Sequence, residues 1–136
     1  MEHILSQLPF FEDQIKSIKE VIISNIVLLG QTPAPTFSEA PRTRLFLERL
    51  ADAQVDECTA DDFNNPVGII KGTSRGAKPP IFTVTHLDTA FNADVDYNYV
   101  VRKNTIMGPG ILDNTVGVGV LASLPVILRK LNISFE

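Results

Sequence analysis

The sequence predicts an α/β protein, built as a partial three-layer open sheet with helices packed on both faces. Helical stretches alternate with short β-rich runs, and clusters of glycine and proline bound those runs. The size agrees, because 136 residues with 44% hydrophobic and 21% charged side chains match one ordinary globular domain. We therefore expect a single unit over residues 1–136.

The first helix is expected from about residue 10 to residue 29. Apolar side chains recur there at helical spacing, namely Ile15, Ile18, Ile22, Ile26 and Leu29. Gly30, Pro33 and Pro35 follow and end the helix, since closely spaced prolines forbid regular helix. The residues around these prolines are therefore expected to form a loop.

The second helix is expected to begin at Ser38. Thr36 and Glu39 have the spacing of a capping box, but that start would place Pro41 where a helical N–H is needed. Ser38 as N-cap instead places Pro41 in the first turn, where no intrahelical partner is required. The apolar face of this helix comprises Leu45, Phe46, Leu47 and Leu50.

Strands and one further helix are expected in the second half of the chain. Residues 67–70 and 81–85 are short β-rich runs, and residues 97–107 are typical of a hairpin, with its turn at Lys103-Asn104, or of an edge strand. An apolar row predicts a last helix over residues 115–131. Residues 132–136 are expected to open another strand, so the architecture is predicted to be truncated at the C-terminus. The alternative is a frayed tail.

Charge and cysteine content exclude several classes of protein. A net charge of −4 argues against a nucleic-acid surface, which needs excess Lys and Arg. The single cysteine, Cys58, cannot form an internal disulfide and favours a reducing compartment. No signal peptide is visible, and the longest uncharged stretch, residues 114–128, is shorter than the ~20 residues that span a bilayer. We therefore expect a cytoplasmic protein with no membrane segment.

His86 and Asp88 are the first candidates for chemistry. Residues two apart in a strand project to the same face, so both side chains would point from the carboxyl edge of the sheet, where α/β proteins bind ligands. Imidazole suits zinc, and a nearby carboxylate can fix its tautomer. The alternative, an exposed His and Asp at a strand end, is favoured by the spacing alone.

Gly108, Gly110 and Asp113 form the second candidate, a tight turn followed by a carboxylate at the mouth of a helix. Asp113 could be merely an N-cap. A phosphate-binding turn is disfavoured, because the Asp113 carboxylate would repel phosphate. Together with His86 and Asp88, Asp113 belongs to the residue types that hold a metal, and two chain segments converging is the usual form of such a site.

With these residues the chain resembles the co-catalytic zinc exopeptidases and deacylases. That family includes tripeptide aminopeptidase (peptidase T), glutamate-releasing carboxypeptidases, and acetylornithine and succinyl-diaminopimelate deacylases. The resemblance covers nearly the whole chain: the leading helix, the proline loop with Glu39 and Arg42, residues 85–89, and residues 108–117. Pro109 stands where family members often have Arg, and this departure favours the tripeptide-aminopeptidase-like branch, so that peptidase is preferred to deacylase.

The resemblance implies a role for each candidate. His86 would bind one zinc, Asp88 would be the catalytic-site aspartate that orients His86, and Asp113 would bridge two zinc ions. The supporting residues would be Asn114, Gly108 and Gly110. A cis peptide bond between Asp113 and Asn114 is also implied, and substrates would be peptides or N-acyl amino acids.

The resemblance also implies that this chain is the N-terminal portion of a metallopeptidase catalytic domain. The general-base glutamate, further ligands and the dimerisation domain would lie beyond residue 136. The chain alone would then be inactive and bind zinc weakly or not at all, and its unfinished sheet would favour self-association. Two alternatives remain: a non-catalytic binding or assembly module with the same fold, and a small nucleotide-binding α/β domain.

Overall fold

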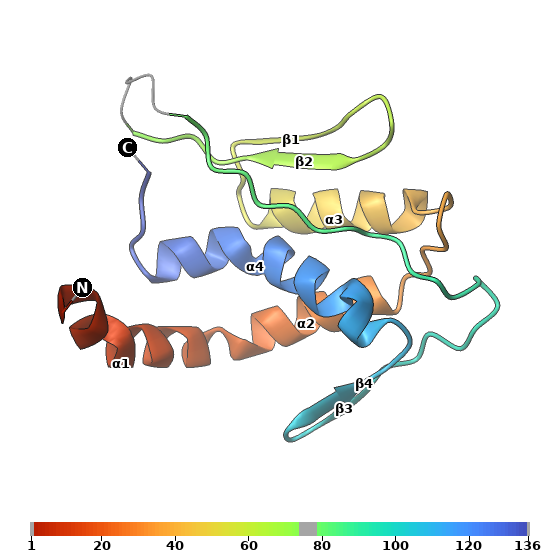
Figure 1. Cartoon of the computed structure of the whole chain (residues 1–136), viewed down its shortest axis with the longest axis horizontal. Helices are drawn as coiled ribbons and strands as arrows, with labels where there is room; N and C mark the ends of the chain where they lie inside the picture. The colour runs from red at the N-terminus through yellow and green to blue at the C-terminus, as the bar shows by residue number, and fades with distance from the viewer. Residues whose placement is uncertain (1, 74–78, 136) are drawn as a thin grey trace.

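The protein combines helices with two small antiparallel sheets in a mixed α/β arrangement (Figure 1). The computed structural model describes residues 2–73 and 79–135. In chain order the elements are α1 (Glu2–Ser17), α2 (Lys19–Gly30), α3 (Ala40–Asp52), β1 (Glu57–Ala60), β2 (Pro66–Ile69), β3 (Val100–Arg102), β4 (Thr105–Met107), the wide helical turn η1 (Ile111–Thr115) and α4 (Val116–Lys130).

The core lies where α4 packs between α2 and α3 (Figure 1). Its fully buried members are Leu29, Phe46, Leu50, Val118 and Ala122. Gly119 permits a close approach of the two backbones, since a Cβ there would lie 2.7 Å from the Ile26 Cα. Beside it the buried Asn25 amide donates to Ser123 Oγ at 2.9 Å, and Ser123 Oγ donates to the Gly119 carbonyl at 2.7 Å. Helix α4 is therefore held to α2 by both packing and a buried polar pair.

The predicted helices are present, with different boundaries at several points: helical residues begin at Glu2 rather than near residue 10, and α4 spans Val116–Lys130 rather than residues 115–131. The first predicted helix is divided at Ile18, whose φ of −112° and ψ of 11° lie outside the helical region. There the Ser17 hydroxyl donates to the Gln14 carbonyl at 2.6 Å, a side-chain bond that competes with the helical backbone. Helix α3 begins one residue later than expected, with Glu39 rather than Ser38 at the N-cap and Pro41 still in the first turn.

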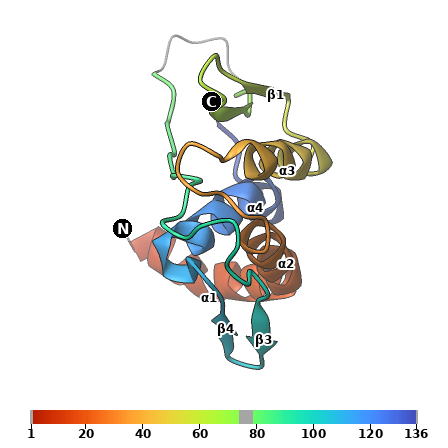
Figure 2. The ribbon, with the colours of Figure 1, turned by 90° about the vertical axis from the view of Figure 1, so that its right-hand side faces the viewer.

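The two sheets are local hairpins on opposite sides of the helices (Figure 2). Strands β3 and β4 form the predicted hairpin around Lys103-Asn104, and β2 matches the expected run at residues 67–70. Strand β1, which pairs with β2 so that Glu57 lies opposite Ile69, was not predicted. Its sequence, Glu-Cys-Thr-Ala, lacks a β-rich run and an apolar alternation.

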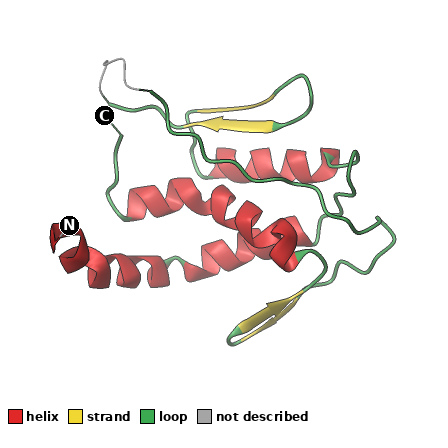
Figure 3. Ribbon diagram, viewed as in Figure 1, coloured by secondary structure: helices red, strands yellow, loops and turns green. Residues whose placement is uncertain are grey.

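The expected layered open sheet is not formed within residues 2–73 and 79–135. Residues 81–85 run as an unpaired loop past α3 (Figure 3). A strand requires a partner for its backbone groups, and in the described part of the chain none bonds to the backbone of this segment. Its apolar side chains face solvent, with Ile81 76%, Phe82 83% and Val84 88% exposed.

The strand expected at residues 132–136 is likewise absent over residues 132–135, while Glu136 lies outside the described residues. Asn132 has a positive φ of 53°, and the Ile133 N–H donates to the Leu128 carbonyl at 2.9 Å. These features close the end of α4 in the manner of a helix C-cap. The segment therefore leaves α4 at this cap, and its Phe135 carbonyl accepts a hydrogen bond from the Thr73 N–H at 2.8 Å.

Residues 111–130, η1 with α4, form a helix long and apolar enough to cross a membrane by length and composition alone. A core helix of a globular protein passes the same test. Helix α4 packs against both α2 and α3, and 33% of this apolar window is buried inside the protein.

Replacing Gly119 by Ala is expected to destabilise the protein by about 1–3 kcal/mol, because the added methyl group would meet the Ile26 backbone. Denaturant unfolding measures the change. Val120→Ala is the matched control, since Val120 is the next residue of α4 and is 41% exposed. A Gly119→Ala variant more stable than wild type would show that the helices can move apart without cost.

We also expect this chain to self-associate through residues 81–85, because their backbone pairs with no other described residue and their apolar side chains are exposed. Sedimentation velocity should show a mass that rises with concentration, and Phe82→Lys should suppress the rise. Phe63→Lys is the control, since Phe63 is 88% exposed in another loop. A monomeric wild type, or an equal effect of both variants, would contradict this expectation.

Candidate metal centre

Three loop segments meet at the predicted site: the proline loop before α3, residues 85–89, and the turn before η1. The proline loop lies parallel to the second segment, with Pro35 bridged to Thr89 and the Thr89 N–H donating to the Ala34 carbonyl at 2.8 Å. The fixed φ of proline limits the conformations of this loop. The loop therefore forms a stiff support for the residues that follow His86.

Arg42 holds the proline loop and residues 85–89 together by hydrogen bonds to both. Its side chain is almost fully buried, with 1% exposed. Nε and Nη2 donate to the Thr32 carbonyl at 2.9 and 2.7 Å, and Nη1 donates to the Leu87 carbonyl at 2.7 Å. Burial lowers the pKa of Arg42 from its ordinary value, and the charges of Tyr99, Tyr97 and Asp88 act in the opposite direction.

The turn around Gly108 and Gly110 is packed against Tyr99. A Cβ at Gly108 would lie 2.2 Å from the Tyr99 ring, and Gly110 has a φ of +65°, so both positions need glycine. The Tyr99 hydroxyl donates to the Pro109 carbonyl at 2.6 Å and lies 3.2 Å from Thr115 Oγ1. Tyr99 therefore fixes the turn that presents Asp113, a role that no sequence motif signals.

Asn114 links this turn to the segment that carries His86. Its amide donates to Thr85 Oγ1, one residue before His86. A Cβ at Gly117 would lie 2.4 Å from Asn114 Oδ1, so the glycine one turn later makes room for this side chain. The peptide bond between Asp113 and Asn114 is cis, as the resemblance implied.

His86 lies between two carboxylates. Its Nε2 is 3.2 Å from Asp113 Oδ1. Its other ring nitrogen, Nδ1, is 3.1 Å from Asp88 Oδ1 and 3.2 Å from the Asp88 carbonyl oxygen. The structure thus brings His86 and Asp113 together and places Asp88 on the opposite side of the imidazole.

Asp88 is anchored by a further residue that the sequence did not single out for chemistry. The Thr36 hydroxyl donates to Asp88 Oδ2 at 2.7 Å. This bond is the largest cause that lowers the pKa of Asp88 from its ordinary value; burial, the next cause in size, raises it, and the hydrogen bond and charge of His86 lower it further. Asp88 is therefore ionised at neutral pH, and each of its carboxylate oxygens can accept a hydrogen bond.

The spacing of the His86 and Asp113 donor atoms can be compared with that of zinc ligands. Two ligands of a tetrahedral zinc at bond lengths of about 2.0–2.1 Å lie roughly 3.3 Å apart. The 3.2 Å between His86 Nε2 and Asp113 Oδ1 matches this spacing. Within residues 2–73 and 79–135 no group of three or more His, Cys, Asp or Glu side chains could hold a metal, so the match in spacing concerns these two donors alone.

Solvent reaches this centre, and an apolar groove begins beside it. The exposed fractions of the side chains are 50% for His86, 33% for Asp88 and 82% for Asp113. The groove, of about 340 Å³, runs from Thr85 and Asn114 along α4. It is lined by Thr83, Val84, Thr85, Asn114, Gly117, Val120, Leu121 and Leu124.

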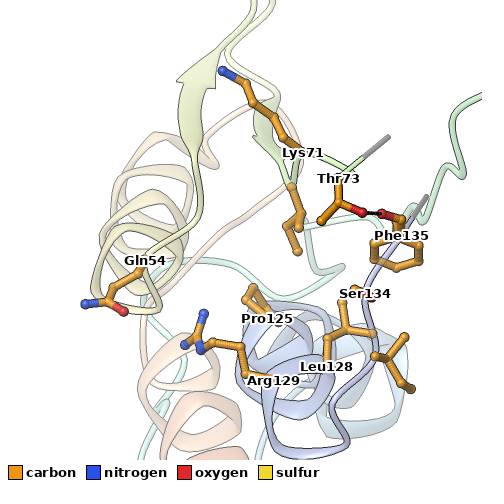
Figure 4. Close-up of a pocket in the computed structure, with 10 residues that line it drawn as sticks. Gln54, Lys71, Thr73, Pro125, Leu128, Arg129, Ser134 and Phe135 are labelled. Carbon is orange, nitrogen blue, oxygen red and sulfur yellow. Dashed lines mark hydrogen bonds between the residues drawn. The ribbon is translucent and has the colours of Figure 1, made fainter. Parts of the chain in front are cut away.

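A separate pocket of about 180 Å³ lies at the other end of α4 (Figure 4). There the Thr73 N–H and hydroxyl both donate to the Phe135 carbonyl, at 2.8 and 3.2 Å. Pro125, Leu128 and Ile133 supply apolar walls. The pocket contains none of the predicted site residues, so we do not assign it to the metal centre.

Comparison with known proteins adds no assignment to these residues. No protein-family model matches the chain, and no curated protein sequence matches it. Function is therefore inferred from the chemistry of the site and from the family resemblance of its residues.

Removing the Thr36 hydroxyl is expected to reduce the free energy of unfolding only at pH values at which Asp88 is ionised. A lowered pKa stabilises the folded state fully above the unfolded-state pKa of about 3.9, and this contribution is lost as pH falls through the lower folded-state pKa. Unfolding free energies of wild type and Thr36→Val should therefore differ at pH 6 and converge in acid. Thr36→Ser should follow wild type throughout. A difference that is independent of pH would contradict this account.

Proposed function

We propose that this chain contributes half of a zinc centre to a hydrolase of peptide or acyl-amide bonds, of the co-catalytic exopeptidase and deacylase type. His86 and Asp113 would hold zinc, and Asp88 would orient His86. The observation that carries the proposal is the position of one imidazole between two carboxylates, at 3.1 and 3.2 Å.

The protonation state of the His86 imidazole decides whether both of its contacts with carboxylates can be favourable. A neutral ring has one N–H and one lone pair. If Nδ1–H donates to Asp88, the lone pair of Nε2 faces the Asp113 carboxylate, and the contact is repulsive unless a positive charge lies between them. Either a second proton on the ring or a metal cation supplies that charge, and the spacing matches a zinc ion.

The resemblance supports the choice of zinc and of an amide substrate. When bound, zinc would polarise the scissile carbonyl and lower the pKa of a bound water. The residues of this chain would hold the metal and fix the orientation of its imidazole ligand. Pro109 favours peptides over N-acyl amino acids as substrates, and the finer exopeptidase fold is part of this proposal.

Zinc titration by calorimetry tests the two donors. We expect weak binding by wild type, because two protein ligands leave most of the coordination to water. His86→Gln and Asp113→Asn should each reduce affinity by at least roughly tenfold, since losing even an outer partner of a ligand typically costs that much.

Two controls match these variants. His3→Gln removes the other histidine of the chain, and Asp94→Asn removes an exposed carboxylate from a loop outside the site. Both should titrate like wild type. Equal titration of wild type and His86→Gln would show that His86 is not a zinc ligand.

Peptidase assays test the proposal that this chain supplies only half of the zinc centre of a hydrolase. This chain alone should not hydrolyse small peptides, because among its described residues only two zinc donors, from His86 and Asp113, come together. Activity that a chelator removes and zinc restores would show that His86 and Asp113 suffice, and the half-site proposal would then be wrong.

A further inference from the structure

We propose that Thr36 is a positioning residue that selects the tautomer of His86, keeping the proton on Nδ1 and the lone pair on Nε2. The expected effect of this tautomer on zinc binding rests on the function proposed above. The assignment itself concerns only the contacts among Thr36, Asp88 and His86.

The contacts form a directed chain. The Thr36 hydroxyl donates its one proton to Asp88 Oδ2 at 2.7 Å. With that oxygen engaged, Asp88 Oδ1 lies 3.1 Å from His86 Nδ1. The Asp88 carbonyl oxygen lies 3.2 Å from the same nitrogen, so Nδ1 faces two acceptors and no donor among the described residues. This arrangement favours a proton on Nδ1.

Thr36 can play this part because its backbone is fixed. It lies 52 residues from Asp88 in sequence. Pro35 is bridged to Thr89, and Arg42 binds the Thr32 and Leu87 carbonyls on either side of this contact. The hydroxyl is thus presented to Asp88 by a loop that is already docked.

The competing state explains why selection matters. Asp88 is one-third exposed, and among the described residues Thr36 is the only partner of Oδ2. Without Thr36 the carboxylate can turn toward water, and the imidazole proton can move to Nε2. Nε2–H would then donate directly to Asp113 Oδ1, 3.2 Å away, and occupy the space between the two zinc donors.

Nitrogen NMR of the metal-free protein tests the tautomer directly. The chain has two histidines, so His3→Gln leaves His86 as the only imidazole, and its two ¹⁵N shifts report which nitrogen carries the proton in the neutral ring. We expect the Nδ1–H form in this background, because Nδ1 faces two acceptors, whereas the 82% exposed Asp113 carboxylate can turn away from the Nε2 lone pair when no cation lies between them. Adding Thr36→Val should shift the population toward Nε2–H, and Thr36→Ser should restore the original spectrum.

Thr32→Val is the matched control, because Thr32 lies in the same loop but its hydroxyl donates to the Leu28 carbonyl at 2.9 Å. It should leave the imidazole shifts unchanged. A Thr36→Val spectrum identical to that of its parent would overturn the proposal, as would an equal change in Thr32→Val.

A double-variant cycle tests whether Thr36 acts through Asp88. Asp88→Ala alone should reproduce the Thr36→Val shifts, and adding Thr36→Val to it should cause no further change. An additional change in the double variant would show that Thr36 influences His86 by another route and would overturn the proposed relay.

Zinc calorimetry then separates this proposal from the proposed function. Thr36→Val should bind zinc up to roughly tenfold more weakly than wild type. This is the lower end of the loss in metal affinity caused by removing a residue that orients a metal ligand. Thr36→Ser should bind zinc as tightly as wild type. If no variant binds zinc, the proposed function fails, and the NMR result alone decides the role of Thr36.

Discussion

The buried guanidinium of Arg42 is the interaction on which the arrangement of the site depends. It joins the Thr32 carbonyl of one loop to the Leu87 carbonyl of another, and both loops reach the site. Hydrogen bonds to a charged group contribute about 1.5–3 kcal/mol each, and an unmet buried partner costs a similar amount. Arg42 can remain buried because carbonyl oxygens meet its donors. Those same bonds set the distance between Thr36 and Asp88.

Much of the candidate site was predictable because its signals are local. His86 and Asp88 are two residues apart, although the strand expected to carry them to the edge of a sheet is a loop in the structure. The glycines on either side of Pro109 mark the turn that presents Asp113. The contributions of Thr36 and Tyr99 could not be predicted in this way. Each acts across a loop or a turn, from a position that carries no motif, and only the folded chain brings its hydroxyl to the site.

The fold was predictable where its stabilising contacts are close in sequence. Helical periodicity located α2, α3 and α4, and the Lys103-Asn104 turn located the hairpin of β3 and β4. The layered sheet was not formed in the described residues, because a β-rich run such as residues 81–85 specifies an extended backbone without specifying its partner. Propensity is a property of the segment, whereas pairing depends on a second strand.

The core and the site are stabilised by different interactions. The core consists of apolar contacts between α2, α3 and α4, whereas the site consists of hydrogen bonds between exposed loops that dock beside those helices. Removing a site hydroxyl therefore need not disturb the packing of Leu29 or Val118. Because the side chains of His86 and Asp113 are 50% and 82% exposed and lie outside the core, their positions follow from loop contacts. A site built in this way can lose its chemistry while the helical core remains intact.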